Sequence, residues 1–264
     1  MTIMKRHRSI AVLLAVSALA SCDYEKNAVQ DIVAAPPASS IRFFNFGLNA
    51  PGVNFYANDT KMTAITSATG AESTLGVGYG GVGAGGFYSG IEPGQYTLSG
   101  RIAATTDKDL PISNLAANIE NGKTYSFFLS GRYNTTAKTV DAFIVEDPFP
   151  PQIDWSRAHV RFVNAIFNAS PMTLYARNQL TGEEIAIGGA AAYKTAGAFT
   201  PVPNGVYDLS ARYAGATTNV LTRPAVSFSF GQIYTITARG DITIAPTTAC
   251  AAANITCLDN TTNR

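Results

Sequence analysis

The chain has 264 residues and a formal net charge of +1, and only 14% of its residues are charged. This length suits one large or two ordinary domains, and the weak charge excludes the basic field that attracts nucleic acid. Abundant glycine, threonine, serine, asparagine and tyrosine favour β-sheets with glycine turns over long helices.

The N-terminus is organised like a secretory signal. Lys5, Arg6 and Arg8 precede an uncharged apolar run over residues 10–20, which is the order of such a signal. The run is well short of the ~20 apolar residues that a membrane-spanning helix needs. We therefore expect the chain to be exported.

Two cleavage sites compete at the end of this run. Residues 18–20 fit an ordinary A-x-A site, whose cleavage would release a free protein. The sequence Leu19-Ala20-Ser21-Cys22 instead resembles the lipobox of bacterial lipoproteins, in which the cysteine carries lipid through a thioether. An odd number of cysteines in an oxidising compartment needs an explanation, and this chain has three. Lipidation of Cys22 leaves Cys250 and Cys257 as a possible disulfide, so we favour the lipobox.

The lipobox predicts a signal peptide at residues 1–21 and a membrane anchor made of palmitate-like acyl chains on Cys22. Stable attachment takes more than one acyl chain, and a lipoprotein cysteine usually carries two or three. The predicted location is the bacterial cell envelope, at either the outer or the inner membrane. Residues 22–39 are polar, with Pro36 and Pro37 near their end, and are expected to form a flexible tether.

Two stretches of the remaining chain repeat one pattern in the same order. Strands are expected at residues 41–46 and 53–57, with asparagine and proline turn signals around them, and the same order recurs at 160–164 and 173–176. Further along, the first copy matches the second in two more pairs of segments, which are 91–101 with 202–212 and 121–128 with 230–237. A duplication this consistent in order indicates two copies of one domain.

The short alternating strands predict an all-β fold of two tandem antiparallel β-sandwich domains. The expected boundaries are domain 1 at 40–147, a stiff proline-rich linker at 148–156, domain 2 at 157–245 and a polar tail at 246–264.

The repeated residues resemble the domain-of-unknown-function family 4397, whose tandem copies occur on secreted proteins and lipoproteins. The resemblance covers roughly residues 41–147 and 158–244, and it implies a β-sandwich of the immunoglobulin or transthyretin kind. It brings no established activity. The matching positions in the second copy are Val160, Arg161, Pro171, Tyr175, Val202, Pro203, Gly205, Tyr207, Leu209, Gly231 and Tyr234.

Catalytic and metal-binding patterns find little support in the sequence. His159 is the only histidine after the signal, and a Ser-His-Asp triad would have to use it; we expect an ordinary surface histidine. Residues 76–81 match G-x-G-x-x-G but lack the following helix that a dinucleotide site needs. The adjacent carboxylates Glu146 and Asp147 are expected to form a solvated face. We predict no enzymatic activity, no cofactor and no metal, since Cys250 and Cys257 lack a ligand spacing.

Aromatic residues supply the candidate binding positions, which are Tyr79, Phe87, Tyr88, Trp155 and Tyr213. The leading hypothesis is a non-enzymatic binding, adhesion or scaffolding role, with envelope proteins or surface glycans as partners and no nucleic acid. The alternative is a carbohydrate-binding accessory module that uses these aromatic side chains. A hydrolase is the least favoured class, and it would depend on His159.

Overall fold

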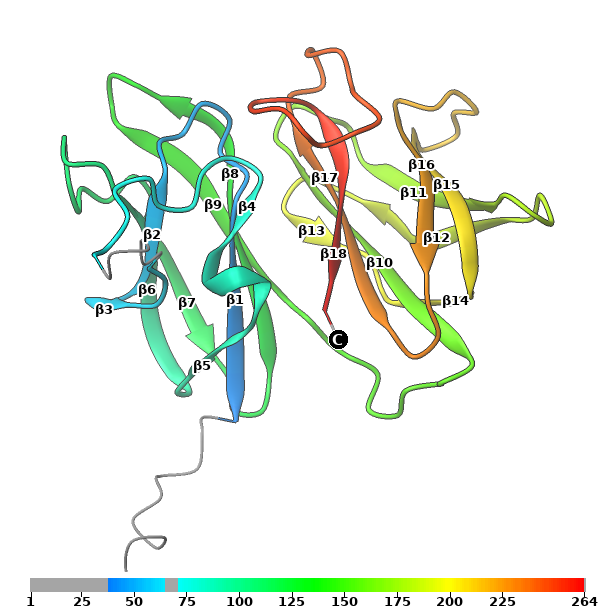
Figure 1. The fold of residues 1–264 in the computed structure, drawn as a ribbon, viewed down its shortest axis with the longest axis horizontal. Coiled ribbons are helices and arrows are strands. Elements are labelled where there is room, and N and C mark those ends of the chain that lie inside the picture. The colour runs from blue at the N-terminus through cyan, green and yellow to red at the C-terminus, as the bar shows by residue number, and fades with distance from the viewer. Residues whose placement is uncertain (1–37, 65–70, 264) are drawn as a thin grey trace, which may run out of the picture. The chain divides into compact units, whose positions relative to one another are not determined.

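The computed structural model describes residues 38–64 and 71–263 (Figure 1). The predicted signal peptide, Cys22 and nearly all of the predicted tether lie outside the described residues. Within the described ranges, no helix has the length and apolar character needed to cross a membrane.

The first copy is a β-sandwich. One sheet has five strands in the order β4-β1-β8-β9, with β5 also paired to β1, and the other has the order β3-β2-β6-β7. A short 3-10 helix, η1 (Gly83–Gly86), follows β4. The strands are β1 (Ser39–Asn45), β2 (Val53–Ala57), β3 (Thr60–Lys61), β4 (Gly81–Val82), β5 (Ser89–Ile91), β6 (Gly94–Ile102), β7 (Leu115–Ile119), β8 (Thr124–Asn134) and β9 (Thr139–Glu146).

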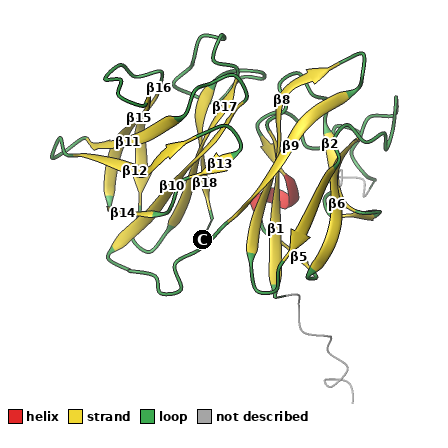
Figure 2. Ribbon diagram, turned by 180° about the vertical axis from the view of Figure 1, so that it is seen from behind, coloured by secondary structure: helices red, strands yellow, loops and turns green. Residues whose placement is uncertain are grey.

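The second copy repeats this arrangement strand by strand (Figure 2). Its sheets have the orders β13-β10-β17-β18, with β14 also paired to β10, and β12-β11-β15-β16. Each strand corresponds to the one nine places earlier, which confirms the duplication. The strands are β10 (Arg157–Ile166), β11 (Met172–Asn178), β12 (Glu184–Ala191), β13 (Thr195–Ala196), β14 (Thr200–Pro203), β15 (Gly205–Tyr213), β16 (Leu221–Phe228), β17 (Ile233–Gly240) and β18 (Cys257–Thr262).

The predicted polar tail over residues 246–264 is wrong in its last part, because Cys257–Thr262 form an edge strand of the second sandwich. This strand, β18, pairs antiparallel with β17 from Tyr234↔Thr262 to Arg239↔Cys257, and it takes the place that β9 takes in the first copy. Polar side chains are tolerated there because an edge strand needs only one bonded neighbour and keeps one side open to water.

The sheets are mixed rather than purely antiparallel. β1 pairs parallel with β8, from Ser40↔Thr124 to Asn45↔Leu129, and β10 pairs parallel with β17 in the same way. A parallel pair needs a long crossover connection, and the intervening strands of each copy supply it by passing through the opposite sheet.

Each sandwich has its own apolar core between its two sheets. In the first copy, Phe43 and Phe55 are stacked with ring centroids 5.1 Å apart, and Phe127 packs on both at 5.9 Å. In the second copy, Phe162 and Ile236 pair within one sheet, Leu174 comes from the other sheet, and all three are fully buried. Burying such a side chain contributes roughly 1.5–3 kcal/mol.

A third apolar cluster joins the two copies. The β1–β8 sheet and the β10–β17 sheet are buried on both faces, because the face opposite each core packs on the other copy. Phe128 stacks on Phe44 at 4.6 Å and on Phe143 at 4.9 Å between ring centroids. The buried members of this interface cluster are Phe44, Phe46, Phe128, Phe143, Val163 and Ala165.

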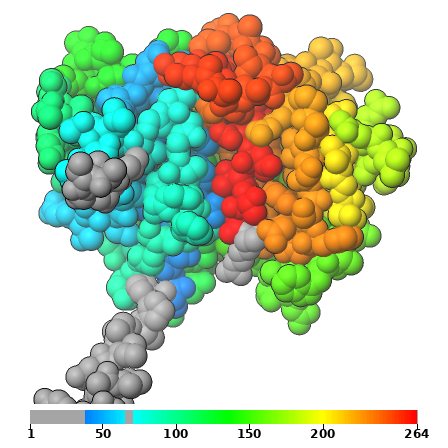
Figure 3. Space-filling view, in the orientation of Figure 1, coloured from blue at the N-terminus to red at the C-terminus, as the bar shows by residue number. Residues whose placement is uncertain are grey.

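The two copies are therefore held together by more than the linker. Figure 3 shows the β18 segment, in red, beside the segment around η1 of the first copy, in cyan. A groove of 520 Å³ runs between them, and its lining includes Arg42, Phe87, Tyr88 and Asn260.

Candidate functional site

The outer sheet faces, which are the faces of β2–β6 and β11–β15 that point away from the cores, carry the same side-chain pair in both copies. The guanidinium carbon of Arg101 lies 4.3 Å from the ring centroid of Tyr56, and that of Arg212 lies 4.4 Å from Tyr175. These positions match in the duplication, since Tyr56 pairs with Ser99 across the sheet and Tyr175 with Ser210. A cation over a ring is worth ~0.5–1 kcal/mol at such sites.

The outer face of the second copy forms a charged groove of 380 Å³. Arg212 donates two hydrogen bonds of 2.7 Å to the Glu184 carboxylate, and these bonds lower the pKa of Glu184. Arg177 and Asp208 add further charge to the lining. Such a surface suits a polar partner with both donors and acceptors.

The corresponding face of the first copy is more covered. Lys61 binds the Glu72 carboxylate at 2.8 Å and lies 5.6 Å from the Tyr56 ring centroid, so Tyr56 is only 5% exposed. The Lys61 hydrogen bond lowers the pKa of Glu72. No motif in the sequence marks either face, although the duplication aligns Arg101 with Arg212.

Two of the predicted aromatic binding residues are displayed. Phe87 is 76% exposed and Trp155 is 73% exposed. Phe87 follows η1 and lines the groove beside β18, whereas Trp155 precedes β10. Tyr213 is half-buried and packs against the second core.

Tyr79 and Tyr88 are half-buried, and the hydroxyl of each is bonded within the molecule. The Tyr79 hydroxyl donates to the Ile255 carbonyl at 2.7 Å in the second copy, and the Tyr88 hydroxyl donates to Asp147 at 2.6 Å. Burial raises the pKa of both tyrosines. Their hydroxyls are engaged because the glycine-rich loop folds onto the interface between the copies.

Asp147 organises a buried polar cluster at this interface, so its predicted place on a solvated face is wrong. Arg161 donates to one carboxylate oxygen of Asp147, while Ser126 donates to the other at 2.7 Å. Arg161 also donates to the Glu146 carbonyl at 2.9 Å and to Thr235 at 3.0 Å. Glu146 is exposed, because adjacent residues of a strand point to opposite faces.

The polar cluster has an internal two-fold relation. Arg42 corresponds to Arg161 in the duplication, and each reaches the residue after the last strand of the other copy. Arg42 donates to Asn263 at 3.3 Å, whereas Arg161 binds Asp147. The pKa of Arg42 is lowered by burial. The two copies thus contact each other through the same sheet face. The residue after the last strand is Asp147 in the first copy and Asn263 in the second.

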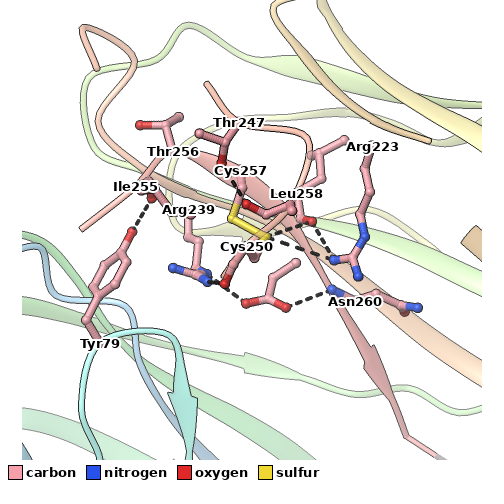
Figure 4. Close-up of a disulfide and its surroundings, with 12 residues drawn as sticks. Tyr79, Arg223, Arg239, Thr247, Cys250, Ile255, Thr256, Cys257, Leu258 and Asn260 are labelled. Atoms are coloured by element: carbon pink, nitrogen blue, oxygen red, sulfur yellow. Dashed lines mark hydrogen bonds and ion pairs between the residues drawn. A yellow bond between two sulfur atoms is a disulfide. The ribbon is translucent and has the colours of Figure 1, made fainter. Parts of the chain in front are cut away.

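Cys250 and Cys257 form a disulfide with Cα atoms 5.7 Å apart (Figure 4). It closes the loop that leads into β18. Arg239 donates to Asp259 at 2.7 Å and to the Cys250 carbonyl at 3.3 Å, while Arg223 donates to the Leu258 carbonyl at 2.8 Å. The bridge therefore fixes the start of the last strand next to two arginines.

Replacing both Cys250 and Cys257 by serine is expected to lower the free energy of unfolding by about 2–3 kcal/mol, the chain-entropy value for a loop this short. The measurement is a urea titration followed by circular dichroism. Reduction of the wild type with dithiothreitol should give the same shift. An unchanged midpoint after complete reduction would contradict this prediction.

His159 is buried near the start of β10. It is only 8% exposed, so the expected surface histidine is wrong, and its Nδ1 has no partner among the described residues. It is buried because Pro201 on β14 and Ile233 on β17 flank it in the sheet. The described part of the chain also holds no group of three or more His, Cys, Asp or Glu residues suited to a metal.

Comparisons with known proteins bear on both copies. Among solved structures, the chain is similar to the Bacillus anthracis TIE protein, with 15% identity and a TM-score of 0.25 over 76% of this chain and 33% of that one. The chain thus spans about a third of that structure. No curated protein matches it. The model of a domain of unknown function (DUF4397) matches twice, at residues 39–175 and 158–256. The chain therefore belongs to the DUF4397 family and carries the domain in two tandem copies.

Proposed function

We propose that the chain is a lipid-anchored protein of the bacterial cell envelope with a non-enzymatic binding or scaffolding role. The observation that carries this proposal is the sequence Leu19-Ala20-Ser21-Cys22 at the end of an apolar run. The disulfide supports it, because Cys250 and Cys257 bind each other and Cys22 is the one remaining cysteine. An acylated cysteine would anchor the sandwiches to a membrane.

The free outer sheet faces support the binding part of the proposal. The other two sheets of the sandwiches face each other, so a partner has access to the Tyr–Arg faces, above all to the groove with Arg212 and Glu184. This groove is lined by charged and polar side chains, which suits a polar envelope partner such as a protein surface. The recognition would resemble a transient interface, with hydrogen bonds and a charged rim.

The carbohydrate-binding alternative depends on fewer residues than the sequence indicated. Tyr79 and Tyr88 use their hydroxyls inside the molecule, which leaves Phe87 and Trp155 as exposed rings. A glycan array with the purified chain tests this alternative. Binding that is lost in Phe87→Ala or Trp155→Ala would favour it over the scaffolding role.

Cys22→Ser is expected to abolish incorporation of a clickable fatty acid into the chain, because serine cannot form the thioether. The measurement is gel fluorescence of cells fed an alkyne-bearing fatty acid, together with flotation of membranes. The double variant Cys250→Ser/Cys257→Ser is the matched control and should keep its label. Label that persists in Cys22→Ser would overturn the lipid anchor.

A further inference from the structure

Two exposed aromatic side chains lie at the turn that leads into β17. Trp155 is 73% exposed and Phe230 is 56% exposed. The Trp155 ring lies over Gly231, where an added Cβ would be 2.9 Å from its Cζ3. The Gly231 N–H also donates to the Arg157 carbonyl at 2.9 Å. Trp155 and Phe230, called here the aromatic pair, are therefore two exposed rings at the turn between β16 and β17, with Phe230 on the turn and Trp155 packed against it.

This surface lies at the end of the unit where β1 begins, called here the proximal end. Ser39 at the start of β1 accepts from the Gly122 N–H at 3.1 Å, and the Asp147 N–H donates to the Thr124 carbonyl at 2.7 Å. The start of β1, the turn before β8 and the end of β9 are thus neighbours. Arg161 on β10 binds Asp147, so β10 also runs beside them. Figure 1 shows the same arrangement, with the start of β1, the 148–156 link and the turn before β17 along the lower edge of the view.

A phenylalanine at position 230 is not required by the domain itself. The turn before β17 has Gly231 with φ +65°, and the turn before β8 has Gly122 with φ +76°, so the two turns correspond. Phe230 matches Asn121, and Asn121 shows that the fold accepts a polar residue there. Phe230 therefore exposes an apolar ring where the fold accepts a polar residue, beside the exposed Trp155 ring.

The tether places the proposed membrane at the same end. Residues 22–37 lead from Cys22 into β1, and sixteen residues span at most about 55 Å when fully extended. A flexible chain of that length has a mean end-to-end distance of ~20–25 Å. Anchoring through Cys22 would therefore hold the proximal end close to the bilayer at a high effective concentration.

Each basic side chain named at the proximal end is in an ion pair. Lys123 binds both Glu120 and Glu146 at 3.0 Å, and Arg157 lies 3.9 Å from Asp154. The surface has no excess of basic side chains, so attraction to anionic headgroups is not needed. Tryptophan and phenylalanine are the residues that enter the boundary between headgroups and acyl chains.

We propose that Trp155 and Phe230 insert into the interfacial region of the bilayer that anchors the chain, and so fix the orientation of the sandwiches on it. This proposal rests on the proposed lipid anchor at Cys22. It identifies the lipid surface itself as the occupant of the aromatic pair, while the outer sheet faces stay available to other partners.

Trp155 is the only tryptophan of the chain, so its fluorescence reports this contact directly. The chain from Cys22 onward is coupled through the Cys22 thiol to a maleimide-bearing phospholipid in phosphatidylcholine vesicles. We expect a blue shift of the Trp155 emission and about a twofold loss of intensity when the acyl chains are brominated near the headgroup. Replacing a quarter of the lipid by phosphatidylglycerol should leave both changes in place.

Phe230→Ser should remove at least half of this quenching, since the remaining ring alone enters the boundary weakly. Leu75→Ser is the matched control, because Leu75 is 79% exposed but its carbonyl lies against Gly52, at the other end of the first sandwich. The proposal would be overturned if Trp155 in the anchored chain had the same emission as in the free chain. It would also be overturned if Phe230→Ser and Leu75→Ser changed the quenching equally. Because the anchor is attached chemically, failure of natural lipidation would appear only in the fatty-acid labelling.

Discussion

Asp147→Ala is expected to lower the free energy of unfolding by about 3–5 kcal/mol, which is the usual cost of removing one partner of a buried ion pair. The Arg161 side chain is 1% exposed and that of Asp147 is fully buried, so water cannot replace the lost carboxylate. Ser126 and Tyr88 would also lose their acceptor. Urea titration followed by circular dichroism measures the change.

Two variants serve as controls for Asp147→Ala. Asp147→Asn keeps the shape and makes the position equal to Asn263, its counterpart, so the loss should be smaller than with alanine. Asn263→Ala removes a neutral partner of Arg42 at 3.3 Å and should cost about 1 kcal/mol. If Asp147→Ala costs no more than Asn263→Ala, the ion pair does not support the interface in the way described.

Phe128→Ala is expected to cost about 3–5 kcal/mol, the range for emptying a large aromatic site in a core. Phe128 is fully buried and stacks on Phe44 and Phe143 in the interface cluster. Its loss should loosen the contact between the copies as well as the first sandwich. The measurement combines a urea titration with hydrogen exchange of the β10 and β17 amides.

The neighbouring Phe127 provides a sharp comparison. It points into the first core and contacts Phe43 and Phe55, so Phe127→Ala should cost a similar amount without speeding exchange in β10. Phe87→Ala, at a site 76% exposed, should stay within ~0.5 kcal/mol. Unchanged exchange in β10 after Phe128→Ala would show that the interface cluster does not couple the copies.

The duplication and the succession of strands along each copy could be predicted from the sequence, because turn residues and apolar strands recur in both copies. The pairing of the strands within each sheet could not. β18 was missed because residues 257–262 are mostly polar and follow a long loop, so neither alternation nor the repeat marks them. Its position follows from backbone pairing with β17, which no local pattern encodes. The disulfide Cys250–Cys257 was raised as a possibility from the cysteine count alone.

The interface was missed for a different reason. The segments around Phe44 and Phe128 are continuous apolar runs rather than strict alternations, which is the pattern of strands buried on both faces. Such runs predict that the sheet face opposite the core is also buried against another part of the molecule. The partners could not be named, because Asp147 and Arg161 meet only after both sandwiches have formed.

The contact of Arg42 with Thr262 and Asn263 joins positions 220 and 221 residues apart. A ribosome makes β1 long before β18. Arg42 therefore lacks these partners until residues 262 and 263 have been made. Contacts this distant in sequence form slowly, so the contact between Arg42 and Asn263 is expected to form late in folding.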